Sequence, residues 1–129
     1  MDRHKVIEFL EKNAHLFDVQ DAREFIDQYF GVSFFKDILD IDTDGEYSFI
    51  SDVTGIIGER SIDREDRVIR YRKFWVGNRI IFTLWNDEIE KYAGLIAVSA
   101  KLKFIFCRIQ ITRFGIEGSL GLRGFIERY

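Results

Sequence analysis

Residues 67–85 read RVIRYRKFWVGNRIIFTLW, and this stretch decides the predicted fold. Two arms, Arg67–Val76 and Arg79–Trp85, flank the dipeptide Gly77-Asn78, and both of its residue types tolerate the positive φ angles of a tight two-residue turn. The sequence therefore predicts a β-hairpin here. One side of its second arm is expected to carry Ile80, Phe82 and Leu84.

Alternating apolar positions predict further strands on both sides of the hairpin. One strand is expected to start at Glu46, with Tyr47, Phe49 and Val53 on one side, and to end at the glycines at 55 and 58. A long strand is predicted over Leu102–Phe114. Four glycines at every third position of 115–124 are expected to form a looping connection. One face of the long strand is predicted to carry Ile105, Cys107, Ile109 and Ile111.

Helical spacing of apolar residues predicts helices in the first third of the chain. They cover roughly residues 2–16, a second segment that begins at Asp21 and ends before Gly31, and a short third one after Ser33. Residues 87–100 follow the candidate cap Asn86 and favour a helix, with a strand through Leu95–Ala100 as the alternative. The prediction is a single α+β domain over 1–129, with N-terminal helices packed on a mainly antiparallel sheet.

The formal charge of −3 hides an uneven distribution along the chain. Residues 1–59 carry 5 Lys and Arg against 14 Asp and Glu, a net charge of −9, whereas residues 60–129 carry a net charge of +6. The domain is thus expected to have an acidic helical part, about 1–45, and a basic β-rich part, about 46–129. Such charge separation bears on the choice of partners.

The chain has the composition of a cytoplasmic protein. Its single cysteine, Cys107, excludes an internal disulfide, and every apolar run ends well before the length of about 18 residues that a membrane span needs. No membrane association is expected. The sequence carries no catalytic signature or cofactor fingerprint, which favours a protein that is not an enzyme.

The first functional hypothesis is a protein-binding module. A small, aromatic-rich, charge-polarised chain without catalytic residues suits a protein that occludes or bridges a macromolecular partner, as an inhibitor, antagonist or immunity-like protein does. An acidic face is expected to attract a basic protein partner and to speed its association. The residues predicted for this face are Glu24, Asp27, Asp37, Asp40, Asp42 and Asp44.

The alternative hypothesis is a single-stranded nucleic-acid binder that uses the first arm of the hairpin. Arginine and lysine can contact phosphates while interleaved rings stack on bases. A homo-oligomer in which the two charged halves meet head to tail is a further possibility. The residues predicted for nucleic-acid binding are Arg67, Arg70, Tyr71, Arg72, Lys73 and Trp75.

No cofactor is expected from the sequence, although one acidic segment offers a candidate calcium site. Asp40, Asp42 and Asp44, followed by Gly45, have the D-x-D-x-D-G spacing and resemble the start of an EF-hand loop. Ser51 stands where that loop has its closing glutamate, so a main ligand is missing. The competing interpretation is a solvated acidic turn that leads into a strand.

Overall fold

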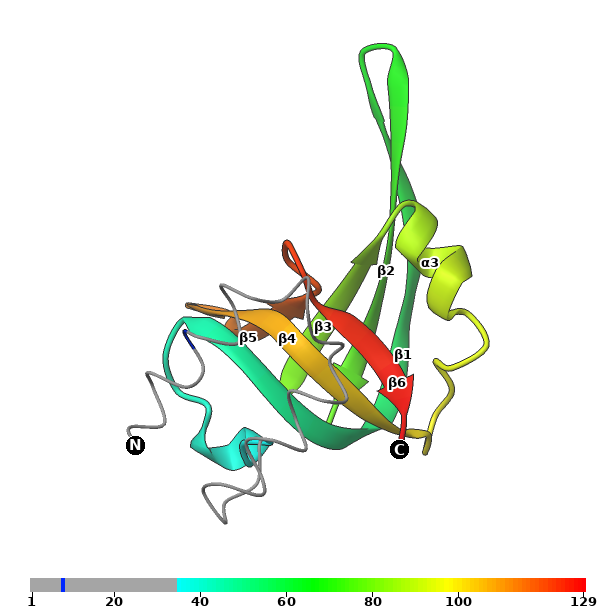
Figure 1. Ribbon diagram of the computed structural model, residues 1–129. Helices are drawn as coiled ribbons and strands as arrows, with labels where there is room; N and C mark the ends of the chain where they lie inside the picture. Colours follow the sequence, from blue (N-terminus) through cyan, green and yellow to red (C-terminus); the bar gives the residue numbers. More distant parts are fainter. Residues whose placement is uncertain (1–7, 9–34) are drawn as a thin grey trace. The chain divides into compact units, whose positions relative to one another are not determined.

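The computed structural model describes Glu8 and residues 35–129, and residues 35–129 form one compact unit. Most of this unit is β-strand. No helix in the described part is long and apolar enough to cross a membrane. In chain order (Figure 1), the elements are the 3-10 turn η1 (Ile38–Asp40), β1 (Gly45–Arg64), β2 (Arg67–Val76), β3 (Ile80–Trp85), α3 (Asp87–Tyr92), β4 (Lys101–Thr112), β5 (Gly115–Ser119) and β6 (Phe125–Arg128).

The first five strands close into a barrel. Their order is β1-β2-β3-β5-β4, and β1 also pairs with β4, so the two ends of the sheet meet. β3 and β5 run parallel, whereas the other neighbouring pairs are antiparallel. β6 extends the sheet by pairing with β4. Closure leaves no open edge around the barrel wall.

β1 is 20 residues long and pairs with two strands in succession. Residues 45–52 pair with β4, and residues 53–64 pair with β2, with register shifts between Val53 and Gly55 and between Ile56 and Gly58. β3 pairs with β2 only from Tyr71 onward. Residues 61–70 therefore form a two-stranded ribbon, which extends beyond the barrel from the Arg60–Tyr71 pair at its base (Figure 1). We refer to residues 60–71, with the pair at the base included, as the ribbon.

Aromatic rings fill the barrel. Phe49, Phe82 and Phe104 have no exposed surface, and the ring centroid of Phe104 lies 4.9 Å from that of Phe49 and 5.0 Å from that of Phe82. Phe74 lies 5.5 Å from Phe82. Gly118 on β5 allows this packing, because a Cβ at that position would lie 2.8 Å from the Phe82 ring. The core is thus built from inward-facing residues of every barrel strand.

The predicted hairpin is confirmed. β2 spans Arg67–Val76, β3 begins one residue later than expected, and Gly77 and Asn78 have φ angles of 58° and 54°. Ile80, Phe82 and Leu84 share the buried side of β3. The long strand is also confirmed as β4, with Ile105, Cys107 and Ile109 fully buried; Ile111, expected on the same side, is 40% exposed.

The predicted α+β architecture is wrong for the described residues. Within residues 35–129 only α3, with 6 residues, is α-helical, and the segment after Ser33 forms just the 3-residue turn η1. The helices predicted over 2–16 and from Asp21 lie outside the described residues, except for Glu8, which is helical. After Tyr92 the chain forms turns up to Ala100, so neither the full helix over 87–100 nor the alternative strand is present.

Two glycine-based predictions also fail. Gly55 and Gly58 do not end the first strand, because β1 passes through both by means of its register shifts. The glycine tract does not simply loop, because Gly115–Ser119 forms β5, which pairs with both β3 and β4. In both places long-range pairing outweighs the local preference of glycine for turns.

Candidate functional site

The side chains of β2 divide into two sets according to the parity of their residue numbers. Successive side chains of a strand point to opposite faces. Phe74 and Val76 are fully buried in the barrel, so even-numbered residues take the core side. Odd-numbered residues take the outer side, where Trp75 is 38% exposed. The outer side of β2 carries Arg67, Ile69, Tyr71, Lys73 and Trp75.

Three aromatic rings and one lysine gather on the outer side of the β2–β3 pair. Tyr71 lies opposite Trp85 in the ladder, with ring centroids 5.5 Å apart, and Trp85 is 41% exposed. Lys73 Nζ lies 5.6 Å from the centroid of the Tyr71 ring. We call Tyr71, Lys73, Trp75 and Trp85 the aromatic platform. It offers exposed ring surface beside a positive charge.

The ribbon continues the same outer side beyond the barrel. Residues that lie directly opposite in an antiparallel ladder share a face. The register places Arg60 opposite Tyr71 and Arg64 opposite Arg67. All three arginines are exposed, and none makes an ion pair or hydrogen bond through its side chain with another described residue. We call Arg60, Arg64 and Arg67 the basic face of the ribbon.

The opposite face of the ribbon has its charges balanced. Glu59 lies opposite Arg72, and Asp63 lies opposite Val68. Arg70 forms an ion pair with Glu90 of α3. Within this pair, Arg70 Nη1 donates a hydrogen bond to Glu90 Oε1, and this hydrogen bond is the main cause of the raised pKa of Arg70 and the lowered pKa of Glu90. Along the ladder, only the outer face carries arginines without an acidic residue opposite them or an ion-pair partner; Glu65 and Asp66 occupy the turn at the tip of the ribbon.

The residues predicted for nucleic-acid binding fall on both faces. Arg67, Tyr71, Lys73 and Trp75 come together on the outer side, whereas the even-numbered Arg70 and Arg72 lie on the other side. Sequence reasoning missed three residues of the outer side. They belong to β1 and β3, and only the pairing register of these strands with β2 places them beside the predicted residues. The missed residues are Arg60, Arg64 and Trp85.

Of the four described aspartates predicted for an acidic face or a calcium site, two accept hydrogen bonds from backbone amides and two are exposed. Asp37 Oδ1 accepts a hydrogen bond of 2.9 Å from the Leu39 amide and caps η1. Asp44 Oδ1 accepts one of 2.7 Å from the Ile111 amide. Asp40 and Asp42 are exposed. The predicted residues Glu24 and Asp27 lie outside the described part.

Metal binding and thiol chemistry find no support among the described residues. No group of three or more His, Cys, Asp or Glu side chains there could hold a metal ion. Cys107 is fully buried, and burial is the main cause that raises the pKa of its thiol, so the thiol stays protonated at neutral pH. A protonated, inaccessible thiol is a poor nucleophile.

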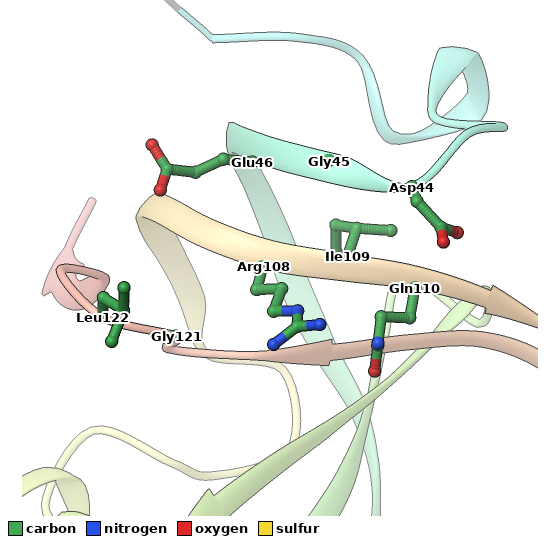
Figure 2. A pocket seen from close by; sticks show the side chains of 8 residues that line it. All are labelled: Asp44, Gly45, Glu46, Arg108, Ile109, Gln110, Gly121 and Leu122. Atoms are coloured by element: carbon green, nitrogen blue, oxygen red, sulfur yellow. The ribbon is translucent and has the colours of Figure 1, made fainter.

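One cavity of about 480 Å³ lies over β4, between the start of β1 and the chain after β5. Figure 2 shows Arg108 and Gln110 extending from β4 on one side and Leu122 beside Gly121 on the other. Glu46 in its wall is paired with Arg123, whereas Arg108 makes no ion pair with any residue that the structure describes. The residues that line it are Asp44, Gly45, Glu46, Arg108, Ile109, Gln110, Gly121 and Leu122.

No protein-family model and no curated protein sequence matches the chain. Solved structures do match in fold. A structure of a replication protein A heterotrimer bound to ssDNA gives a TM-score of 0.58 at 13% identity, over 73% of this chain and 24% of the other. The protein described here thus spans about a quarter of that chain.

Two shorter structures match over most of their own length. The second OB-fold domain of replication protein A from Methanococcus maripaludis gives a TM-score of 0.55 at 13% identity, over 72% of this chain and 92% of the other. A replication factor A related protein from Methanobacterium thermoautotrophicum gives 0.56 at 15% identity, over 74% and 90%. The described residues therefore have the OB-fold, a small Greek-key barrel.

The comparisons also overturn the first functional hypothesis. One of the structures that match in fold is a replication protein A heterotrimer bound to ssDNA, and this neighbour favours the alternative hypothesis over an inhibitor-like, protein-binding module. The prediction of a protein as the leading partner has no support among the matching structures.

Proposed function

We propose that the protein binds single-stranded nucleic acid through the aromatic platform and the basic face of the ribbon. One observation carries the proposal: the exposed rings of β2 and β3 share a single face with arginines of β1 and β2 that make no ion pair with a described residue. In OB-folds generally, the surface of strands 2 and 3 and the loop between strands 1 and 2 bind oligonucleotides. The aromatic platform and the ribbon occupy these two positions.

The two parts suit the two halves of a nucleotide. Trp75, Tyr71 and Trp85 offer ring surface on which unpaired bases can stack, an interaction worth about 1–3 kcal/mol per base in related sites. Arg60, Arg64 and Arg67 lie beyond the rings, where guanidinium groups can pair with successive phosphates. Stacking on an exposed platform requires bases that are free of a duplex, which favours a single strand.

The net charge of −3 does not oppose this function. Phosphates respond to the local potential, which is screened within about 8 Å at physiological ionic strength. Along the outer side, the ribbon and the adjoining platform carry Arg60, Arg64, Arg67 and Lys73, while Glu65 and Asp66 occupy the turn at the tip of the ribbon. The acidic residues Glu59 and Asp63 lie on the other face of β1.

The proposed role is binding without catalysis. Cys107 is fully buried and the pKa of its thiol is raised, which makes it a poor candidate for a nucleophile. Binding and protection of a strand need only the surface that the platform and the ribbon provide.

The test is fluorescence anisotropy of the full chain with labelled single strands of about 15 nucleotides, oligothymidylate and oligouridylate, and with a duplex of the same length. We expect the single strands to bind more tightly than the duplex, and the affinity to fall steeply between about 50 and 200 mM salt as counterions are released. Absence of binding at low salt, or equal binding of duplex and single strand, contradicts the proposal.

A further inference from the structure

The junction between the ribbon and α3 is tied together by one arginine and one asparagine. The β2–β3 ladder ends at the pair of Tyr71 and Trp85. One residue further, the Arg70 amide donates a hydrogen bond of 3.1 Å to Asn86 Oδ1, and the Asn86 amide donates one of 2.9 Å to the Arg70 carbonyl oxygen. The guanidinium adds a contact of 3.4 Å from Nη2 to the Asn86 carbonyl oxygen.

α3 is attached to the same point. Arg70 Nη1 pairs with Glu90 on α3, which lies beside the base of the ribbon (Figure 1). The carboxylate of Glu88, also on α3, accepts a hydrogen bond of 2.8 Å from the Trp85 amide. One end of the platform and the base of the ribbon are thus both held against the same short helix.

The side chain of Asn86 bonds to Arg70 and does not cap α3. Asn86 occupies the N-cap position of α3, where an asparagine side chain normally accepts a hydrogen bond from the helix. Here that oxygen is bonded to Arg70, and no side-chain cap is made. The residue also has a φ of 51° and a ψ of −121°, an unfavourable conformation for an L-amino acid. At Asn86, the hydrogen bonds to Arg70 therefore outweigh both the preference for capping the helix and the preference for a favourable backbone conformation.

We propose that Arg70, Asn86 and Glu90 form a brace that holds the ribbon in one orientation relative to the aromatic platform, so that Arg70 is a positioning residue and not a phosphate contact. This inference rests on the proposed function. A two-stranded ribbon has little stability of its own. Holding it in place before binding removes part of the ordering cost that association carries.

Removal of the negative charge of Glu90 distinguishes two effects on binding: positioning of the ribbon by the brace, and electrostatic attraction between the protein and the nucleic acid. If only net charge mattered, Glu90→Gln would strengthen binding to a polyanion. If the brace positions the ribbon, Glu90→Gln weakens oligothymidylate binding, by about two- to fivefold on the scale of an exposed ion pair. Asp63→Asn is the matched control, because Asp63 lies on the same face of the ribbon as Arg70 and its side chain makes no ion pair or hydrogen bond with another described residue. It is expected to bind equally well or slightly better.

The salt dependence of Arg70→Ala gives a second readout. A positioning residue lowers affinity with an unchanged slope of log K against log salt, whereas loss of a phosphate contact lowers the magnitude of that slope by about 0.7. Glu90→Gln that binds as tightly as the wild type, or an Arg70→Ala slope reduced by that amount, overturns the brace.

Hydrogen exchange tests the brace without any ligand. The amides of Arg70 and Asn86, which close the junction, are expected to exchange several times faster in Glu90→Gln than in the wild type, and at the wild-type rate in Asp63→Asn. Unchanged exchange in Glu90→Gln overturns the brace. Failure of the wild type to bind any oligonucleotide instead overturns the proposed function, so the two failures are distinguishable.

Discussion

Tyr71 and Trp85 face each other across the β2–β3 ladder, with ring centroids 5.5 Å apart and an angle of 50° between the ring planes. The two rings support each other at the point where the barrel passes into the ribbon. A tilted pair leaves ring surface open to solvent, and Trp85 remains 41% exposed. This pair and Trp75 form the part of the surface on which bases are expected to stack.

Truncation of Trp75 is expected to weaken binding with little effect on folding. Trp75→Ala should cost about 1–3 kcal/mol of binding free energy, the range for loss of one stacked base. Anisotropy with oligothymidylate measures the loss, and thermal unfolding monitors the fold. Leu122→Ala removes an exposed apolar side chain at the cavity over β4 and should leave affinity unchanged. Equal affinities for the wild type and Trp75→Ala would remove Trp75 from the interface.

The arginines of the two ribbon faces should differ in salt dependence. Arg64→Ala and Arg67→Ala are each expected to reduce the slope of log K against log salt by about 0.7, because each removes one phosphate contact with a single strand. Arg72→Ala carries the same loss of charge on the other face and serves as the control. A larger effect from Arg72 than from Arg67 contradicts the assignment of faces.

Gly118 should tolerate no side chain. A Cβ there would lie 2.8 Å from the Phe82 ring and 3.2 Å from Ile80 Cγ2, inside a close-packed core. Gly118→Ala is therefore expected to lower the free energy of unfolding by about 1–3 kcal/mol, as measured by urea denaturation. The control is Gly94→Ala, where a Cβ meets nothing within 4 Å. It should be neutral or slightly stabilising, and equal effects of the two substitutions would contradict the packing of β5.

The ion pair of Arg70 and Glu90 gives a defined pH dependence. The pKa of Glu90 lies below its ordinary value of 4.5 because the carboxylate accepts a hydrogen bond from Arg70. Its contribution to stability is present above pH 4.5 and disappears as the pH falls through the lower, folded-state pKa. The difference in melting temperature between the wild type and Glu90→Gln should shrink over this acidic range. A difference that grows on acidification contradicts the pairing.

Cys107 should be unreactive in the native protein. Its thiol has no exposed surface and a raised pKa, so little thiolate is present or accessible at neutral pH. A thiol reagent such as Ellman's reagent should label the native chain slowly and the urea-unfolded chain rapidly. The ratio of the two rates measures the protection. Rapid labelling of the native chain is incompatible with burial of Cys107 in β4.

The sequence predicts those parts of the fold that depend on neighbouring residues. Gly77 and Asn78 both adopt positive φ angles, and adjacent residues of these types are typical of a tight two-residue turn. The β2–β3 hairpin is therefore predictable from the sequence. The alternation around Cys107 likewise indicates β4. Barrel closure is different, because it depends on pairing of β1 with β4 and of β3 with β5, strands that lie far apart in the chain.

The candidate site was only partly predictable for the same reason. Basic and aromatic residues in 67–75 are visible in the sequence, and their alternation alone would have separated Arg70 from Arg67. Arg60 and Trp85 become neighbours of Tyr71 only through the register of two ladders. No local pattern reports that register, because it depends on the two shifts in the pairing of β1 with β2.

β1 is both a wall of the barrel and one strand of the ribbon, and this limits how the protein can change in evolution. Gain or loss of one residue between the register shifts and Arg60 would turn Arg60 and Arg64 to the side now occupied by Glu59 and Asp63. Insertions or deletions of an even number of residues in each strand would keep the cations in line. Homologous proteins with longer or shorter ribbons are thus expected to differ in steps of two residues per strand.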